Sequence, residues 1–293
     1  MSRPDQDRSG AGTPAPSRET IIVHKGHGLP YSKGLMAQAI SATGLSPGRA
    51  FELARVIEER LDGGSIRTAD LHALAEQVLR TEQDELTARR YASWRRLDRL
   101  ERPLVVLLGG TTGVGKSTIA TMLAARLGVN RVIATDVIRQ VLRAFFTHEA
   151  MPTVHYSAFE AGGIAGYREQ ADHVGTGITA IVDRAASEAK PVVVEGVHVV
   201  PGAVHPRMRE RCVLVEALIV VEDQDLHRGH FSHRRGTRPA ERYIASFEDI
   251  RRLQDHLWER ARSEGVTVVD NENVDDALAR LMQLVLDAVQ EVQ

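Results

Sequence analysis

From residue 104 onward, short apolar runs alternate with longer stretches in which apolar residues recur every three or four positions. The short runs have the length and composition of buried strands, and the periodic stretches are typical of amphipathic helices. This pattern predicts strands at 104–109, 131–135, 191–199, 213–221 and 266–270. It predicts helices at 116–127, 137–147, 165–189, 247–264 and 274–290. Such alternation predicts a mostly parallel five-stranded sheet with helices on both faces, a three-layer α/β/α domain at 103–293.

The residues before Pro103 follow a different pattern. Residues 1–18 are rich in Pro, Ser, Gly and charged residues, and we expect a disordered tail. The pattern of residues 19–98 predicts a small helical domain, with one short strand at Ile21-Ile22-Val23. Two of its helices begin near Ser46-Pro47 and near Thr68, because a capping hydroxyl precedes apolar residues at helical spacing. A third helix, rich in arginine, is predicted at about 82–100.

Composition narrows the possible partners and compartment. The chain has 293 residues, of which 43% are apolar, and its formal net charge is −2. That balance gives no overall attraction to nucleic acid or to an anionic membrane, so we expect neither as a partner. The single Cys212 fits a reducing compartment, and no apolar run approaches the ~18 residues of a membrane span. We therefore expect a cytoplasmic protein, whose oligomeric state the sequence leaves open.

The segment GTTGVGKS follows the first predicted strand of the α/β domain and opens the first helix. Glycines let the backbone turn sharply and bring its N–H groups against phosphate oxygens, and a helix N-terminus favours an anion. Lys116 can reach the terminal phosphates, and the Ser117 hydroxyl can bind Mg²⁺. The segment predicts a P-loop NTPase fold that binds ATP and Mg²⁺. The expected nucleotide-binding residues are Gly110, Thr111, Thr112, Gly113, Val114, Gly115, Lys116, Ser117 and Thr118.

The second predicted strand ends in Asp136, and the helix after it carries Arg139 and Arg143 on one face. Ligands of parallel sheets bind beyond the carboxyl ends of the strands, so Asp136 is expected near the γ-phosphate. There it can accept a proton from an acceptor hydroxyl or hold a water on Mg²⁺. The two arginines match the geometry of phosphate and carboxylate groups. The alternative is that Asp136 caps the helix and the arginines form surface ion pairs.

The third predicted strand leads into Glu195-Gly196-Val197-His198. A carboxylate after an apolar strand suits the Mg²⁺ shell, which predicts Ser117 and Glu195 as the metal residues. His198 is either a contact to substrate phosphate or a structural, partly buried histidine.

Residues 227–243 concentrate five arginines, among them Arg234 and Arg235. We expect a lid that closes on the nucleotide, with Arg234 acting on the transferred phosphoryl group and Arg235 binding the acceptor. A metal site at the three nearby histidines and an RNA-binding patch are weaker alternatives, because carboxylate or cysteine ligands and stacking aromatic residues are scarce there. The irregular insert at 149–166 is a candidate wall of the acceptor pocket.

Two resemblances follow from these motifs. Residues 22–26 and 29–33, with the helices after them, resemble an ATP-cone, a small nucleotide-sensing domain. Residues 19–293 resemble the 2-phosphoglycerate kinase family in GGTTGVGKSTIA, RVIATDVIRQVLR, the HYSAFEA insert, VVEGVHVVPG and FSHRRGTRPAERY. The resemblance implies phosphorylation of a small anionic substrate, 2-phosphoglycerate, by ATP at its 3-hydroxyl, giving 2,3-diphosphoglycerate. The catalytic residues would then be Lys116, Asp136, Glu195 and Arg234, and the substrate-binding residues Arg139, Arg143, His198 and Arg235.

Other functions remain open on the sequence alone. A GTPase is disfavoured, because the chain has no guanine-reading Asn-Lys-x-Asp segment. A kinase of the same fold acting on another hydroxy acid or on a sugar phosphate is one alternative. An ATP-sensing regulatory module without transfer activity is another.

Overall fold

The computed structural model describes residues 20–24, 27–61, 63–97, 100–204, 207–232 and 240–292. Its larger part is built on five strands that pair in the order β5-β6-β4-β7-β8, and every pairing is parallel. The strands are β4 (Leu104–Gly109), β5 (Val132–Ala134), β6 (Val192–Glu195), β7 (Val213–Val220) and β8 (Thr267–Asp270). The predicted α/β fold with a parallel five-stranded sheet is therefore confirmed.

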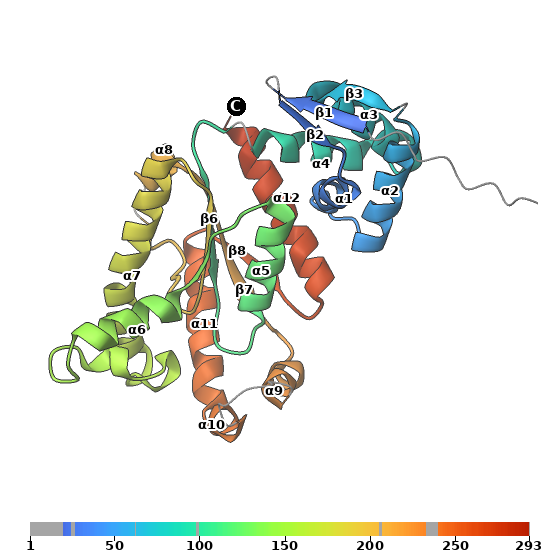
Figure 1. The fold of residues 1–293 in the computed structure, drawn as a ribbon. Coiled ribbons are helices and arrows are strands. Elements are labelled where there is room, and N and C mark those ends of the chain that lie inside the picture. The colour runs from blue at the N-terminus through green and yellow to red at the C-terminus, as the bar shows by residue number, and fades with distance from the viewer. Residues whose placement is uncertain are drawn as a thin grey trace, which may run out of the picture.

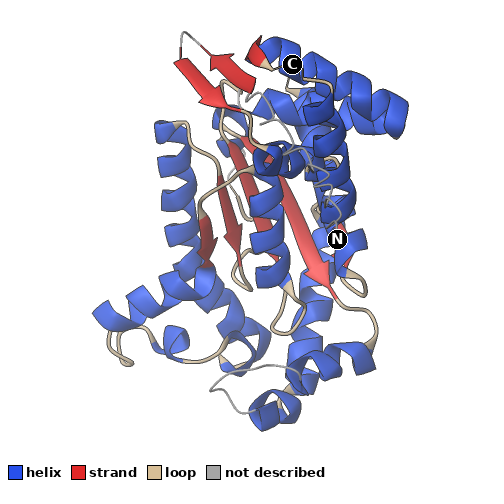
Figure 2. Cartoon of the chain, turned by 45° about the vertical axis from the view of Figure 1, so that its right-hand side comes forward, coloured by secondary structure: helices blue, strands red, loops and turns tan. Residues whose placement is uncertain are grey.

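Helices cover both faces of this sheet, as Figures 1 and 2 show. Alternate residues of β4 point to opposite faces, so Val106 packs on one side and Leu107 on the other. The Val106 face is covered by α5 (Lys116–Leu127) and α12 (Val274–Glu291). The opposite face is covered by α7 (Gly163–Glu188) and α11 (Phe247–Ser263). Since helices exclude water from both faces of the sheet, the central strand β4 is apolar and buried along its whole length.

Two boundaries differ from the prediction in ways that matter for the site. The helix α6 spans Thr135–Phe145, so Asp136 lies in its first turn rather than at a strand end. The strand β6 ends at Glu195 instead of residue 199, because Gly196 has φ +151° and turns the chain. A Cβ at Gly196 would lie 2.8 Å from the Thr135 Cβ, so a side chain has no room there. The apolar run VHVV therefore continues as a buried turn rather than as strand.

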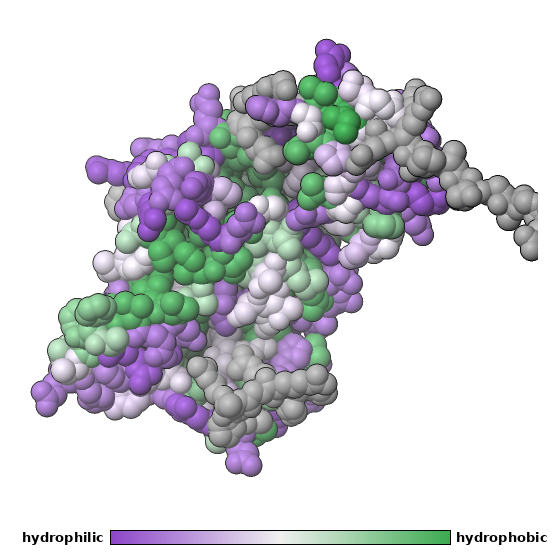
Figure 3. All heavy atoms as spheres, in the orientation of Figure 1, coloured by the Kyte–Doolittle hydropathy of each residue, from purple (hydrophilic) through white to green (hydrophobic). Residues whose placement is uncertain are grey.

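Short elements fill the remaining connections of the α/β domain. Two 3₁₀ turns, η2 (Pro152–His155) and η3 (Ala158–Glu160), form the predicted insert. The helices α8 (Met208–Arg211), α9 (Gln224–Ser232) and α10 (Ala240–Ala245) were not predicted as elements. Figure 3 shows an apolar patch over α6, where Val137, Val141 and Phe145 are 59%, 50% and 80% exposed. No helix in the described ranges is long and apolar enough to cross a membrane.

The N-terminal domain is mixed α/β rather than helical. A three-stranded sheet of order β2-β1-β3 joins β1 (Thr20–His24), β2 (His27–Pro30) and β3 (Gly64–Arg67). Its helices are α1 (Lys33–Ser41), α2 (Pro47–Glu59), α3 (Thr68–Glu82) and α4 (Glu85–Arg96). The strands β2 and β3 escaped prediction because each has only four residues, most of them exposed. The correspondence to an ATP-cone stays a prediction, and the predicted tail at 1–18 lies outside the described residues.

The N-terminal domain packs against α5 and α12, on the side of the sheet away from α7 and α11 (Figure 1). Ala42 and Trp94 contribute to the core of the α/β domain. Polar contacts join the two parts as well: the Gln38 amide donates to Ala125 O at 2.8 Å, and the Gln290 amide donates to the Ser93 hydroxyl at 2.8 Å. This domain therefore supports the back of α5, the helix that begins at the glycine-rich loop.

Candidate active site

The glycine-rich loop connects β4 to α5 and is held in place from outside by α9. Gly113 has φ +94°, a conformation that favours glycine. A Cβ there would collide with Phe231 Cζ and would lie 2.9 Å from His227 Nε2. The loop and α9 thus approach closely because residue 113 lacks a side chain.

Two histidines of α9 bind loop carbonyls directly. His227 Nε2 donates to Thr112 O at 2.9 Å, and His230 Nδ1 donates to Gly113 O at 2.9 Å, since a carbonyl oxygen can only accept. Burial lowers the pKa of His227 to about 4, so the ring is neutral at pH 7. The sequence offers these histidines only as a weak metal site, and their contact with the loop was not predicted. Their spacing of three, on one face of a helix, is the signal that points to a shared target.

Lys116, Ser117 and Glu195 lie together at the start of α5. The Lys116 ammonium donates to Thr111 O at 3.3 Å, and the Ser117 hydroxyl donates to Glu195 Oε1 at 2.8 Å. Glu195 is 5% exposed, and its second oxygen, Oε2, is buried without a hydrogen-bond partner. A buried carboxylate oxygen with no donor is costly unless something else binds it.

Mg²⁺ is a cation that fits this arrangement. It prefers oxygen ligands and is usually held by one or two carboxylates together with phosphate oxygens and water. Among the described residues no group of three or more His, Cys, Asp or Glu side chains can hold a metal by itself. A site of one hydroxyl and one carboxylate, completed by a nucleotide's phosphates, agrees with both observations.

Asp136 faces the same space from the first turn of α6. It does not cap the helix: the capping position is Ala134, which makes no side-chain capping bond. Its carboxylate accepts from Arg139 Nε at 3.2 Å, and 54% of its side chain is exposed. Burial acts to raise the pKa of Asp136, but the positive charges of Arg139 and Lys116 outweigh it and lower the pKa below its usual value. The group is therefore ionised at neutral pH.

Arg139 is buried, unlike the surface pair that was the alternative. Its Nη1 donates to Val154 O and Tyr156 O, both at 3.2 Å, so it fastens the insert to α6 while orienting Asp136. Arg143, one turn further on, is exposed and is not among the residues that line the pocket described next. The structure thus brings Arg139 to the site and leaves Arg143 outside it.

The side chains of Lys116, Ser117, Glu195, Asp136 and Arg139 line one pocket of about 180 Å³. The insert and α10 form its outer wall, through residues such as Phe159 and Tyr243. Its lining comprises Thr112, Lys116, Ser117, Ala134, Asp136, Arg139, Ser157, Ala158, Phe159, Glu195, Gly196, Val197 and Tyr243. A second pocket, of about 310 Å³, is also lined by Lys116 and Ser117, together with residues such as His230, Asn271 and Val274. Lys116 and Ser117 therefore border two spaces, which suits a reaction between two substrates.

The predicted lid is only partly described. Arg234 and Arg235 lie outside the described residues. Of the other arginines, Arg242 on α10 forms an ion pair with Glu160, its Nε lying 2.8 Å from Oε1. Arg228 on α9 stacks over the Phe247 ring at 4.6 Å. These two arginines join α9 and α10 to their neighbours rather than facing the pocket.

His198 lies beside the pocket without lining it. Gln170 donates its amide to Thr153 O and Tyr156 O, so its oxygen accepts, and His198 Nε2 must donate to it at 2.9 Å. His198 Nδ1 then accepts from the Thr135 hydroxyl at 3.0 Å. Both ring nitrogens are thereby used, and the geometry supports a positioning role for the start of α6 rather than a substrate contact.

This buried histidine predicts a pH dependence of stability. Burial lowers the pKa of His198 to about 4, from an ordinary value of 6.5. A group with a lowered pKa that is neutral when folded stabilises the protein fully above pH 6.5, and the stabilisation is lost as the pH falls from 6.5 to 4. The loss amounts to ~3 kcal/mol of unfolding free energy. Urea unfolding of His198→Asn should show a flatter pH dependence over this range, whereas His173→Asn, at a partly exposed position of α7, should match the wild type.

Comparisons with known proteins identify the family of the chain. The Zeta toxin family matches residues 89–189. A 2-phosphoglycerate kinase of Methanopyrus kandleri is 34% identical, over 92% of this chain and 87% of its own length. A protein of the same name from Pyrococcus horikoshii is 36% identical, over 92% of this chain and 95% of its own. A solved gluconokinase from Sinorhizobium meliloti is 18% identical, over 66% of this chain and 94% of its own, with a TM-score of 0.37. With two relatives above 30% identity along nearly their whole lengths, the chain belongs to the 2-phosphoglycerate kinase family.

Proposed function

We propose that the protein transfers the γ-phosphoryl group of ATP to the 3-hydroxyl of 2-phosphoglycerate, giving 2,3-diphosphoglycerate and ADP. The observation that carries this proposal is the pocket of about 180 Å³, which joins the phosphate-binding Lys116 and Ser117 to Asp136 and Arg139. A cytoplasmic location, the reducing compartment that the lone Cys212 suits, is part of the proposal.

The donor would bind along the glycine-rich loop. Backbone N–H groups at the start of α5 and the Lys116 ammonium would hold the phosphates, and the nucleoside would extend toward the pocket lined by His230 and Asn271. Ser117 and the unpaired Oε2 of Glu195 would hold Mg²⁺, which supplies charge neutralisation between the phosphates.

The acceptor would bind in the smaller pocket, in front of α6. The positive charges of Arg139 and Lys116 favour an acceptor that is itself an anion, such as a phosphorylated hydroxy acid. The ionised Asp136 would accept the hydrogen bond of the attacking hydroxyl and orient it in line with the γ-phosphorus. As the new P–O bond forms and the bond to ADP breaks, the hydroxyl proton passes to Asp136. Phosphoryl transfer needs positioning and charge more than a strong base, which suits a carboxylate of lowered pKa.

The test is acceptor-dependent release of ADP from MgATP. The rate is expected to rise at least tenfold when 2-phosphoglycerate is added, and 31P NMR should show a product with two phosphate esters. 3-Phosphoglycerate, which has its free hydroxyl on the neighbouring carbon, and glycerate, which lacks the phosphate, are the matched comparisons. A larger stimulation by either would reassign the acceptor within the same reaction, and the absence of stimulation by any hydroxy acid or sugar phosphate would contradict a kinase.

A further inference from the structure

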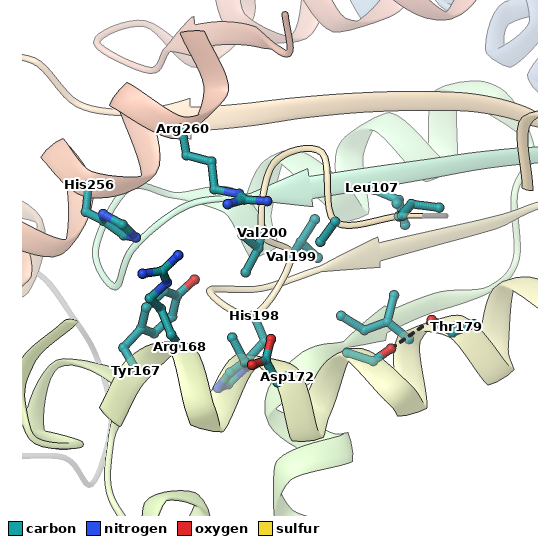
Figure 4. Close-up of a pocket in the computed structure, with 15 residues that line it drawn as sticks. Leu107, Tyr167, Arg168, Asp172, Thr179, His198, Val199, Val200, His256 and Arg260 are labelled. Atoms are coloured by element: carbon teal, nitrogen blue, oxygen red, sulfur yellow. Dashed lines mark hydrogen bonds between the residues drawn. The ribbon is translucent and has the colours of Figure 1, made fainter. Parts of the chain in front are cut away.

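A larger cavity lies between α7, α11 and the turn that follows β6 (Figure 4). Its volume is about 430 Å³, more than twice that of the acceptor pocket. The wall nearest the sheet contains Leu107 and Val199, and α7 contributes Ile178. None of the groups assigned above to the nucleotide, the metal or the acceptor hydroxyl lines this cavity.

The cavity is apolar at one end and basic at the other. Figure 4 shows Arg168 of α7 and His256 and Arg260 of α11 directed toward the same end, while Leu107 and Thr179 lie at the opposite end. Arg260 keeps its position by donating its Nε to Pro201 O at 2.9 Å. Burial lowers the pKa of His256, and the charges of Arg168 and Arg260 act in the same direction, whereas Glu259 opposes them. Arg260 also pairs with Glu264, at 3.6 Å. Asp172, exposed on α7, is the acidic residue of the lining.

A glycine in the middle of α7 keeps the cavity open. Gly175 lines the cavity, and a Cβ placed on it would meet no atom within 4 Å. Glycine in a helix interior is destabilising relative to alanine. Its neighbour Gly177 has a packing reason, since a Cβ there would lie 3.7 Å or less from two Ile138 atoms, but Gly175 has none. Arg168, Asp172, Gly175 and Thr179 repeat at helical spacing, so one face of α7 is turned to this space.

We infer that this cavity is a second ligand site, which binds a small organic anion distinct from the nucleotide and the acceptor. A phosphate or carboxylate head would lie between Arg168, His256 and Arg260, and an apolar body would extend past Gly175 toward Leu107. The inference goes beyond the proposed function and does not depend on it. His198 forms part of the cavity wall and also bonds Thr135 at the start of α6, whose neighbours Ala134 and Asp136 line the acceptor pocket.

Calorimetric titration of the full chain with phenyl phosphate tests the inference, with MgADP present to fill the nucleotide site. Phenyl phosphate is expected to bind, and benzoate distinguishes a carboxylate-preferring site from a phosphate-preferring one. Inorganic phosphate lacks the apolar body, and benzyl alcohol lacks the charge, so each should bind at least tenfold more weakly than the better of the two aromatic anions.

Two variants locate the binding. Gly175→Phe fills the cavity and should abolish binding, and Arg168→Ala removes one exposed guanidinium and should weaken it at least tenfold. The matched controls are Gly175→Ala, which adds only a methyl group, and Arg184→Ala, which removes an arginine of the same helix that pairs with Glu188 instead. Binding retained in Gly175→Phe, confirmed as folded by circular dichroism, would overturn the assignment. The failure of both aromatic anions to bind the wild type would do the same.

Discussion

Glu195→Gln is expected to lower turnover by about 10²-fold and to raise the Mg²⁺ concentration for half-maximal activity by about 10- to 100-fold. Glutamine keeps an oxygen that can accept the Ser117 hydroxyl, so the 2.8 Å hydrogen bond seen in the structure need not be lost. What the substitution removes is the negative charge and the free oxygen Oε2, which is buried without a partner. The measurement is the rate of ADP formation as a function of Mg²⁺ at fixed ATP.

Glu216→Gln is the matched control. Glu216 lies on β7, which β4 separates from β6; one of its oxygens accepts from Gly202 N at 2.8 Å, and the other lies 3.7 Å from Arg209 Nη2 without a hydrogen-bond partner. Burial raises the pKa of Glu216, while the Gly202 N–H and the charge of Arg209 act to lower it. This variant should keep wild-type Mg²⁺ dependence, because Glu216 faces away from the glycine-rich loop. If Glu216→Gln changed the Mg²⁺ dependence as much as Glu195→Gln does, the unpaired oxygen of Glu195 would not indicate a metal site, and Glu195 would not be assigned to Mg²⁺.

Local pattern was enough to predict the sheet, because the strands of the α/β domain are short and mostly apolar. The order of the strands in the sheet could not be predicted from local pattern, because it differs from their order along the chain. β4 comes first in the sequence of this domain but lies in the middle of the sheet. Short, exposed strands such as β2 and β3 carry little hydrophobic signal, so the N-terminal domain was predicted as helical.

At the site, the sequence predicted the residues that a motif or a strand end marks, Lys116, Ser117, Asp136 and Glu195, and they line one pocket. It could not assign His198, because its role depends on Gln170, 28 positions away, and on Thr135. It also did not indicate that α9 binds the glycine-rich loop, since His227 and its partner Thr112 are 115 positions apart. Roles that rest on contacts between distant segments appear only once the fold is known.

Asp136→Asn is expected to lower turnover with the acceptor by about 10²- to 10³-fold while leaving MgATP binding within about twofold. Asparagine has nearly the same shape and can still accept from Arg139, so α6 and the insert should remain in place. The loss would come from the missing negative charge, which orients the attacking hydroxyl and takes its proton. The measurements are turnover with saturating acceptor and calorimetric titration of MgATP.

A matched control separates this role from simple helix stabilisation. Asp249 also lies in the first turn of a helix and pairs with an arginine three positions on, Arg252, at 2.7 Å, with 51% of its side chain exposed. Asp249→Asn should remove an exposed ion pair of the same i,i+3 spacing, worth ~0–1 kcal/mol, and leave turnover unchanged. Because the pKa of Asp136 is lowered, wild-type activity should be retained at pH 6 and decline only when acidity protonates this carboxylate. Turnover of Asp136→Asn equal to that of Asp249→Asn would leave Asp136 as a structural partner of Arg139 and would require another base.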